Sequence, residues 1–148
     1  DLVNLIKENI KLLKELDESI EINFSNNFDK IIHVSDNEQL SRVFFNLIKN
    51  SIESIHQKVE KDSNINKKIN IELNDFDNHI SFTIVDTGIG FDDLKSDIKD
   101  ILNPYFTTKK NGTGLGLSIV NKIINDHNGN IKFESTKNGA KIKVLFSK

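Results

Sequence analysis

The chain has 148 residues, of which 36% are hydrophobic and 28% charged, and its formal net charge is -2 at pH 7. Such a composition is typical of one globular domain, and no apolar run reaches the roughly 18 residues of a membrane span. The low net charge excludes a general electrostatic attraction for nucleic acid or anionic lipid, and the absence of cysteine excludes disulfides and thiol chemistry. We therefore expect a cytoplasmic domain with no nucleic-acid partner and no direct membrane contact.

Helical and strand patterns alternate in the first part of the chain. Apolar side chains at helical spacing predict an amphipathic helix over residues 2–16. Two short β-rich runs, 20–24 and 31–34, lie around an Asn-Asn turn signal and predict two strands. Ser35 and Glu38 then have the spacing of a capping box, so we expect Ser35 to cap a second helix with an apolar stripe.

The second part of the chain predicts two strand pairs separated by a helix. Residues 69–73 and 80–85 alternate apolar and polar side chains across a polar turn, which predicts an antiparallel hairpin. A third helix is predicted over residues 113–127, and strands over 131–134 and 142–146. This order of elements predicts an α+β fold in which helices and sheet form separate layers.

Two residues mark expected breaks in these elements. The residue before Pro104 disfavours helical dihedrals, so we expect residues 91–111 to form an irregular, functional loop. Gly129 follows the third predicted helix, and we expect it to end that helix in the left-handed conformation.

Asn46 and Asn50 lie four residues apart in the second predicted helix and therefore share one of its faces. Asparagine is less favourable than alanine inside a helix by ~0.5 kcal/mol, so two on one face indicate a role beyond solubility. In a chain rich in asparagine, a solvated helix surface gives the same pattern, and both interpretations stay open.

Asp86, Gly88 and Gly90 directly follow a predicted strand, which puts a carboxylate at the strand end and two permissive glycines in the departing turn. A carboxylate in this position can accept a hydrogen bond from the amine of a base. A tight turn capped by the aspartate explains these residues equally well when they are considered alone.

Three glycines, at positions 112, 114 and 116, open the third predicted helix, where backbone N–H groups and the helix dipole favour anions. Their spacing differs from that of a P-loop, and they follow a loop instead of a strand, unlike the glycines of a Rossmann site. The preceding residues 103–110 contain two aromatic rings, two threonine hydroxyls and two lysines. This segment either closes over a triphosphate or forms a solvated basic loop.

Taken together and in this order, the motifs resemble those of the histidine-kinase branch of the ATPase superfamily shared with DNA gyrase, MutL and a heat-shock chaperone. Residues 46–50 resemble the N box, 86–90 the first glycine box, 104–109 the Phe box and 112–116 the second glycine box. The likeness spans nearly the whole chain and is nearest to nitrogen-regulation-type kinases. It implies the Bergerat fold, a two-layer α/β sandwich with three main helices on one face of a mixed, mainly antiparallel sheet, and an ATP lid.

The resemblance implies ATP and Mg²⁺ as cofactors and gives roles to individual residues. Asn50 is expected to ligate Mg²⁺, whose preferred ligands are oxygens, while Asn46 helps to hold the metal and the phosphates. The implied catalytic residues are Asn46, Asn50 and Lys109. The implied nucleotide-binding residues are Asp86, Gly88, Gly90, Phe106, Lys110, Gly112, Thr113, Gly114, Leu115, Gly116 and Leu117.

Position 46 separates the branches of this superfamily. Hydrolytic members carry a glutamate there, four residues before the metal-binding asparagine, and use it as a general base. The amide of Asn46 cannot take a proton, so the resemblance implies a kinase that transfers the γ-phosphoryl group to a histidine. Two departures leave contacts in doubt: Glu53 stands where many relatives have a basic residue, and Ala140 where many have threonine.

The phosphoacceptor is not expected among the four histidines, because none has the acidic-flanked helical context of that site. One of them, His127, suits the negative end of the third predicted helix. The chain begins with Asp1 and lacks methionine, so we interpret residues 1–148 as one domain of a longer protein. The implied partners are a histidine-bearing dimerisation domain of the same protein and, indirectly, a response regulator. We expect a monomeric fragment of a homodimeric parent that is cytoplasmic or anchored in the inner membrane.

Two other functions stay open. A serine kinase of the anti-sigma-factor type shares the fold and nearly this length, but it normally keeps the glutamate that Asn46 replaces. A degenerate module would hold nucleotide, or none, and act only by docking to a partner. The presence of Asn50, Asp86 and the glycines disfavours this second alternative.

Overall fold

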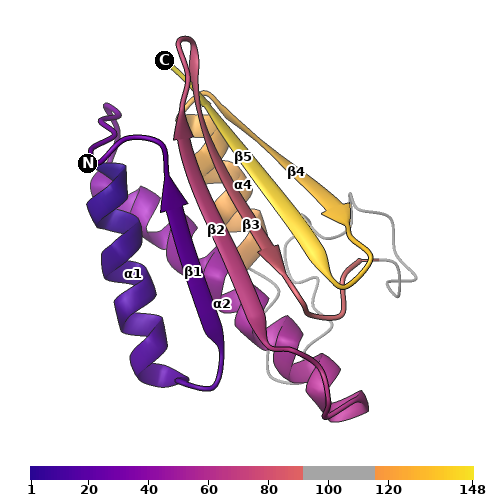
Figure 1. Ribbon diagram of the computed structural model, residues 1–148. Coiled ribbons are helices and arrows are strands. Elements are labelled where there is room, and N and C mark those ends of the chain that lie inside the picture. The colour runs from indigo at the N-terminus through magenta and orange to yellow at the C-terminus, as the bar shows by residue number, and fades with distance from the viewer. Residues whose placement is uncertain (92–115) are drawn as a thin grey trace.

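A five-stranded mixed sheet forms one layer of the structure (Figure 1). The computed structural model describes residues 1–91 and 116–148. The strands lie in the order β1-β2-β3-β5-β4; β1 and β2 pair in parallel, and the other neighbours pair antiparallel. The mixed, mainly antiparallel sheet is therefore confirmed. The strands are β1 (Glu21–Asn26), β2 (Lys68–Asp75), β3 (His79–Asp86), β4 (Gly129–Ser135) and β5 (Ala140–Ser147).

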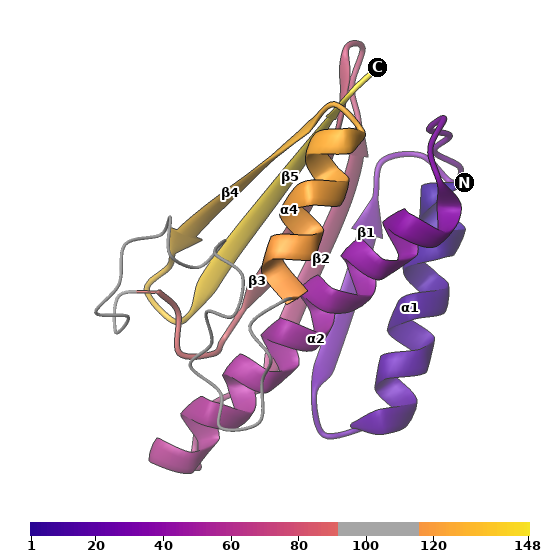
Figure 2. The same cartoon turned by 180° about the vertical axis from the view of Figure 1, so that it is seen from behind.

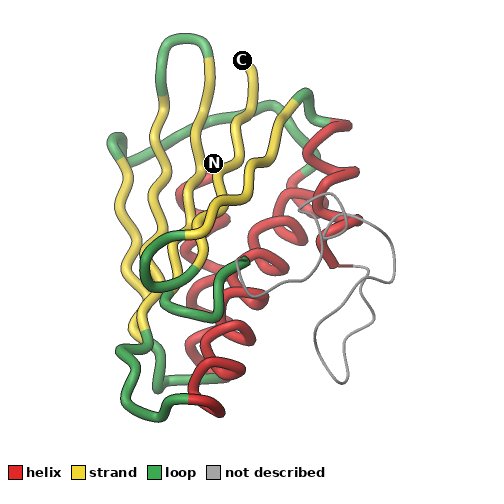
Figure 3. Tube along the Cα trace, turned by 90° about the vertical axis from the view of Figure 1, so that its right-hand side faces the viewer, coloured by secondary structure: helices red, strands yellow, loops and turns green. Residues whose placement is uncertain are grey.

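The helices α1 (Leu2–Leu16), α2 (Asn37–Lys61) and α4 (Gly116–Asp126) form the second layer. Figures 2 and 3 show them on the same face of the sheet, and α2 contacts both α1 and α4. The predicted two-layer sandwich is confirmed, whereas the predicted lid falls on residues 92–115, outside the described part of the chain. None of the described helices combines the length and apolar character that crossing a membrane requires.

The core lies between the layers, where the apolar side of each helix meets one face of the sheet. Buried side chains recur along α1 at helical spacing, and every second side chain of β2 is buried. The rings of Phe44 in α2 and Phe82 in β3 have their centroids 4.9 Å apart. Each large apolar side chain buried in this way contributes about 1.5–3 kcal/mol. This contact holds α2, and the residues on its polar face, at a fixed position under the sheet.

Residues 31–34 do not form the predicted strand. Ile31 is fully buried, but its carbonyl accepts the N–H of Leu2 at the start of α1, at 2.8 Å. Val34 is 96% exposed. The apolar run therefore anchors the connection from β1 to α2 in the core through one side chain, and its backbone pairs with a helix end instead of a strand.

Two predicted caps fall on neighbouring residues. Asp36, and not Ser35, caps α2, because its Oδ1 accepts the N–H of Gln39 at 3.0 Å. After α4 the left-handed residue is Asn128, with φ 55, instead of Gly129. Gly129 is required for packing, since a Cβ there would lie 2.8 Å from Ile124 Cγ2.

His127 joins the end of α4 to the start of α2. Its Nε2 accepts the N–H of Asp36 at 3.2 Å, and its Nδ1 lies 2.8 Å from the carbonyl oxygen of Ile123. His127 therefore lies at the C-terminal end of α4, the negative end of the helix dipole, and its ring connects that end to the cap of α2.

Candidate nucleotide-binding site

Asn46 and Asn50 lie one turn apart on α2, and both side chains are half-buried. The start of α4 lies against the first of them, because a Cβ added to Gly116 would be 3.8 Å from Asn46 Oδ1. The first N–H groups of a helix have no partner inside it, and the helix dipole favours negative charge at this end. A phosphate held at the start of α4 would therefore also lie near the amide of Asn46.

Asp86 ends β3 with its side chain inside the protein, 4% exposed. Its Oδ1 accepts the N–H of Gly88 at 2.9 Å and the N–H of Ala140 at 3.4 Å. Burial raises the pKa of this carboxyl group, and the Gly88 N–H, the Ser51 hydroxyl, the Ala140 N–H and the Lys58 charge oppose that rise. Because both backbone bonds fall on Oδ1, the second oxygen keeps the capacity to accept from a ligand.

Gly88 packs directly against α2. A Cβ at Gly88 would lie 2.1 Å from Ser54 Oγ and 2.8 Å from the Ser54 carbonyl carbon, so a larger residue does not fit without movement. The Ser54 hydroxyl oxygen also accepts the N–H of Ile89 at 3.0 Å. The turn after β3 is therefore fixed to the helix that carries Asn46 and Asn50, one turn beyond Asn50.

Gly139, at the tip of the β4–β5 hairpin, closes the other side of this turn. A Cβ on Gly139 would lie 2.0 Å from the Asp86 carbonyl oxygen, so the two backbones are in direct contact. Gly90 has φ 71, a left-handed conformation that favours glycine, and a Cβ there would lie 2.8 Å from the Gly139 carbonyl oxygen. The glycines at 88, 90 and 139 thus allow the backbone around Asp86 to be packed closely from both sides.

A hollow of about 360 Å³ lies between the turn after β3, the hairpin tip and the end of α2. Lys58 connects α2 to the hairpin tip across this hollow, because its Nζ donates to the Asn138 carbonyl oxygen at 2.7 Å. The lining carries more cationic than anionic side chains, so the hollow favours anionic ligands. Its lining residues are Lys58, Lys61, Asp62, Gly88, Ile89, Gly90, Ser135, Thr136, Lys137, Asn138 and Gly139.

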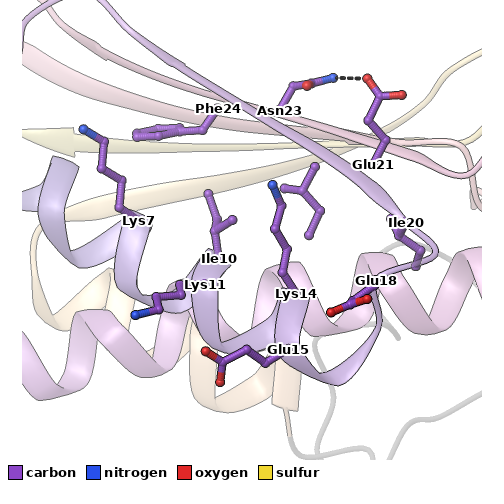
Figure 4. A pocket seen from close by; sticks show the side chains of 11 residues that line it. Lys7, Ile10, Lys11, Lys14, Glu15, Glu18, Ile20, Glu21, Asn23 and Phe24 are labelled. Carbon is purple, nitrogen blue, oxygen red and sulfur yellow. Dashed lines mark hydrogen bonds between the residues drawn. The ribbon is translucent and has the colours of Figure 1, made fainter.

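A larger hollow, of about 780 Å³, lies between α1 and β1 and holds none of the predicted site residues (Figure 4). Charges of both signs line it, so it has no clear preference for a charged ligand. These side chains are Lys7, Lys11, Lys14, Glu15, Glu18 and Glu21. We therefore place the candidate site around Asp86, where the predicted motifs meet α2.

The described residues include part of the predicted site. Asn46, Asn50 and the turn at residues 86–90 all lie on or against α2, and Gly116 adjoins Asn46. Leu117 is half-buried and packs against the core. The remaining predicted residues lie outside the described part of the chain; they are Phe106, Lys109, Lys110, Gly112, Thr113, Gly114 and Leu115.

Three residues of the site were missed from the sequence. Ser54 and Gly139 hold the turn after β3 in place, and Ser51 lies close enough to Asp86 to lower its pKa. The position of Ser54 carried a usable signal, because it continues the four-residue spacing of Asn46 and Asn50 along α2. Contacts of Gly139 join distant segments, and no local pattern predicts them.

A magnesium ion in this site would depend on amide oxygens. Among residues 1–91 and 116–148, no group of three or more histidine, cysteine, aspartate or glutamate side chains could hold a metal ion. Asn46 and Asn50 present their amides from one face of α2, and Mg²⁺ typically combines few protein oxygens with phosphate oxygens and water. These residues therefore fit a magnesium ion that arrives with a nucleotide.

Sequence comparisons place the chain among known proteins. Residues 35–148 match the family described as histidine kinase-, DNA gyrase B- and HSP90-like ATPase. A Rickettsia felis protein named as an NtrY-like sensor histidine kinase is 31% identical over 147 residues, which covers 99% of this chain and 23% of that protein. The signal transduction histidine-protein kinase AtoS of Escherichia coli is 31% identical over 134 residues, covering 88% of this chain and 20% of that protein. The chain thus spans less than a quarter of the length of these relatives.

Solved structures show the same fold. The catalytic domain of the histidine kinase ThkA, in a nucleotide-free form, has a TM-score of 0.83 at 30% identity, covering 99% of this chain and 92% of that chain. ThkA in complex with the response regulator TrrA gives a TM-score of 0.76 at 26% identity, covering 100% of this chain and 40% of that chain. The predicted family is confirmed: the chain belongs to the histidine kinase-, DNA gyrase B- and HSP90-like ATPase family, and its fold is that of a histidine kinase catalytic domain.

Proposed function

We propose that this chain binds Mg-ATP and donates the γ-phosphoryl group to a histidine on a separate dimerisation domain of a two-component sensor kinase. The observation that carries the proposal is the buried Asp86 carboxyl group, enclosed by glycines and backed by α2. A carboxyl group whose charged form is made unfavourable by burial is a common mark of a functional site. The names of the matched relatives and of ThkA support the kinase assignment.

Adenine recognition is the role that we give to Asp86. Two backbone N–H groups hold Oδ1, which fixes the carboxyl group and leaves the second oxygen to accept the exocyclic amine of the base. Gly88 and Gly90 allow the backbone to pass close to this point without side chains in the way. The turn after β3 thereby becomes one wall of the base pocket.

Phosphate and metal binding belong, in this proposal, to α2 and the start of α4. Asn50 and Asn46 would hold Mg²⁺, which, when bound, neutralises charge on the phosphates. Gly116 lies at the start of α4 beside Asn46, where helix N–H groups favour an anion. Roles for Lys109, Phe106 and the glycines at 112 and 114 rest on the resemblance alone.

The proposed reaction is transfer to histidine and not hydrolysis. Asn46 occupies the position of the general base in the hydrolytic branches, and its amide cannot accept a proton from water. The ATP γ-phosphoryl group would then persist until a histidine nucleophile arrives, and catalysis would come mainly from positioning and charge neutralisation. The same residue disfavours the serine-kinase alternative.

The proposed partners follow from the histidine-kinase family. The chain would act on a dimerisation domain of its own protein, and a response regulator would receive the phosphoryl group later. ThkA has been solved in complex with the response regulator TrrA, which supports a partner of that class. We propose a cytoplasmic, monomeric catalytic domain within a homodimeric parent.

Calorimetry with Mg-ADP tests the base-recognition role. Asp86→Asn keeps an oxygen for the Gly88 and Ala140 N–H groups but loses the charge that attracts the amine. We expect binding to weaken by ~1.5–3 kcal/mol, or about 10- to 150-fold in Kd. Asp77→Asn, an exposed change in the β2–β3 turn, is the matched control and should bind like the original chain. Equal affinity for both variants would remove Asp86 from the site.

A transfer assay tests the kinase step separately. Asn50→Ala should abolish phosphorylation of a supplied histidine-bearing hairpin from radiolabelled ATP, while the circular dichroism spectrum stays unchanged. Transfer at the original rate would exclude Asn50 from metal and phosphate positioning.

A further inference from the structure

Ser51 carries a buried polar atom without a partner. The side chain is 2% exposed, and its hydroxyl makes no hydrogen bond to any of the residues that the structure describes. A serine inside a helix usually directs its hydroxyl to solvent or to the carbonyl four residues earlier. A buried hydroxyl without a partner is unfavourable for folding, so its presence calls for a physical reason.

The surroundings of Ser51 point to Asp86. The hydroxyl lies close enough to lower the pKa of that carboxyl group, although the two groups do not reach hydrogen-bond geometry. Opposite Asp86, the paired residues are Ile69 on β2 and Ala140 on β5, whose side chains cannot donate. From α2, the groups that act on the carboxyl are Ser51 and the charged Lys58. Ser51 is therefore the neutral side-chain donor available to Asp86 from these neighbours.

We propose that Ser51 is a positioning residue for the nucleotide base, an inference that rests on the proposed function. When a purine base occupies the site, the Ser51 hydroxyl donates to the Asp86 carboxyl group and holds it ionised, with one oxygen toward the exocyclic amine. Ala140 pairs with Asp86 across the sheet, but its methyl group cannot donate a hydrogen bond. The Ser51 hydroxyl therefore supplies the side-chain donor to the carboxyl group. The reason for the unpartnered hydroxyl is then ligand recognition and not folding.

Ser51→Ala separates these two roles. The affinity for Mg-ADP at about pH 7.5 should fall about three- to tenfold, because one hydrogen bond to the carboxyl group is lost. The midpoint of urea unfolding should stay the same or rise, because a buried unsatisfied hydroxyl is removed. Ser51→Thr keeps the hydroxyl and should retain more of the affinity than Ser51→Ala.

The pH dependence of Mg-ADP affinity gives a second readout. Asp86 has to be ionised to accept the amine, so affinity falls as the pH drops through the pKa of its carboxyl group. Loss of the Ser51 hydroxyl removes a contact that lowers this pKa, while Lys58 remains in place. The acid limb of the Ser51→Ala profile should therefore lie at higher pH, when measured from about pH 8 to about pH 5.

Ser81→Ala is the matched control. Ser81 is also buried, 5% exposed, but it lies elsewhere on β3, paired with Asn74 and Leu145, and its removal should leave the affinity for Mg-ADP unchanged. If Ser51→Ala binds Mg-ADP as the original chain does, with a superimposable pH profile, the inference is wrong and the proposed function stands. A clear fall in the urea unfolding midpoint of Ser51→Ala would also overturn it, because the hydroxyl would then serve the fold. If the original chain does not bind Mg-ADP, the proposed function fails, and the inference fails with it.

Discussion

One methyl group at Gly88 should disturb the contact between the turn after β3 and α2. In Gly88→Ala the new Cβ would lie 2.1 Å from Ser54 Oγ, 2.7 Å from Ser54 Cβ and 2.8 Å from the Ser54 carbonyl carbon. Favourable contacts between carbon atoms need about 3.5–4.0 Å, so the turn has to move from α2 by roughly 1 Å. Overpacking of this kind costs about 1–3 kcal/mol, and we expect the unfolding free energy to fall by that amount.

A second substitution tests whether the Ser54 contact causes the loss. Ser54→Gly removes Oγ and Cβ from the clash and leaves the backbone carbon. Gly88→Ala should therefore cost less in the Ser54→Gly background, with a coupling free energy of about 0.5–1.5 kcal/mol between the two sites. Urea unfolding of the four proteins measures this coupling, and Mg-ADP titrations of the same set report whether Asp86 moves with the turn.

Gly116→Ala is the control for adding a methyl group to a glycine of this domain. Within residues 1–91 and 116–148, the side-chain atom nearest to its new Cβ is Asn46 Oδ1 at 3.8 Å, an ordinary contact. Alanine is favoured over glycine inside a helix by up to about 1 kcal/mol, so this variant should be as stable as the original chain or more stable. The reasoning is refuted if Gly88→Ala lowers the unfolding free energy by less than about 0.5 kcal/mol, or equally in both Ser54 backgrounds.

Three further outcomes follow from the site and the core. Asn46→Glu supplies a general base, and a positioned base of this kind accelerates a reaction by about 10²-fold or more. The rate of phosphate release from ATP should therefore rise by up to about 10²-fold, as measured by a colorimetric assay. Burial raises the pKa of Asp86 above 3.8, so its charge disfavours folding at neutral pH; Asp86→Asn should raise the urea midpoint at about pH 7 while it weakens nucleotide binding. Burial lowers the pKa of His33 below 6.5, so protonation of this ring favours the unfolded chain. The contribution of the neutral ring to the unfolding free energy is fully present above pH 6.5 and is lost as the pH falls below it. His33→Gln should reduce this loss in urea titrations between about pH 7 and pH 5.

Local pattern was sufficient for most of the fold. The spacing of apolar residues predicted α1 with the bounds that the structure has, because a surface helix shows its buried face directly in the sequence. Residues 31–34 have a strand-like composition but no strand beside them, and pairing is a property of the whole sheet. Likewise, Ser35 and Asp36 are both good caps, and only the path of the chain into α2 selects Asp36.

The candidate site was predictable in its motifs and not in its supports. Asp86 and the glycines after it form a contiguous pattern that a family resemblance can identify. The contact of Gly88 with Ser54 joins residues 34 positions apart in the chain, and that of Gly139 with Asp86 joins residues 53 apart. Such contacts depend on how the turn, the hairpin and α2 pack in three dimensions, and a single sequence carries no direct signal for them.

Two unfavourable local features lie at this site, whereas another buried polar side chain, that of Asn9, is satisfied. Asn9 is also buried, but its amide donates to the Leu5 carbonyl oxygen and to Ser41. Around the turn after β3, by contrast, burial disfavours the charge of Asp86, and the hydroxyl of Ser51 has no partner among the described residues. A ligand that binds only the folded protein at these groups offsets their unfavourable terms and raises stability with its concentration. The rise in unfolding temperature on adding Mg-ADP should therefore be smaller for Asp86→Asn than for the original chain, even though the variant begins from a higher stability.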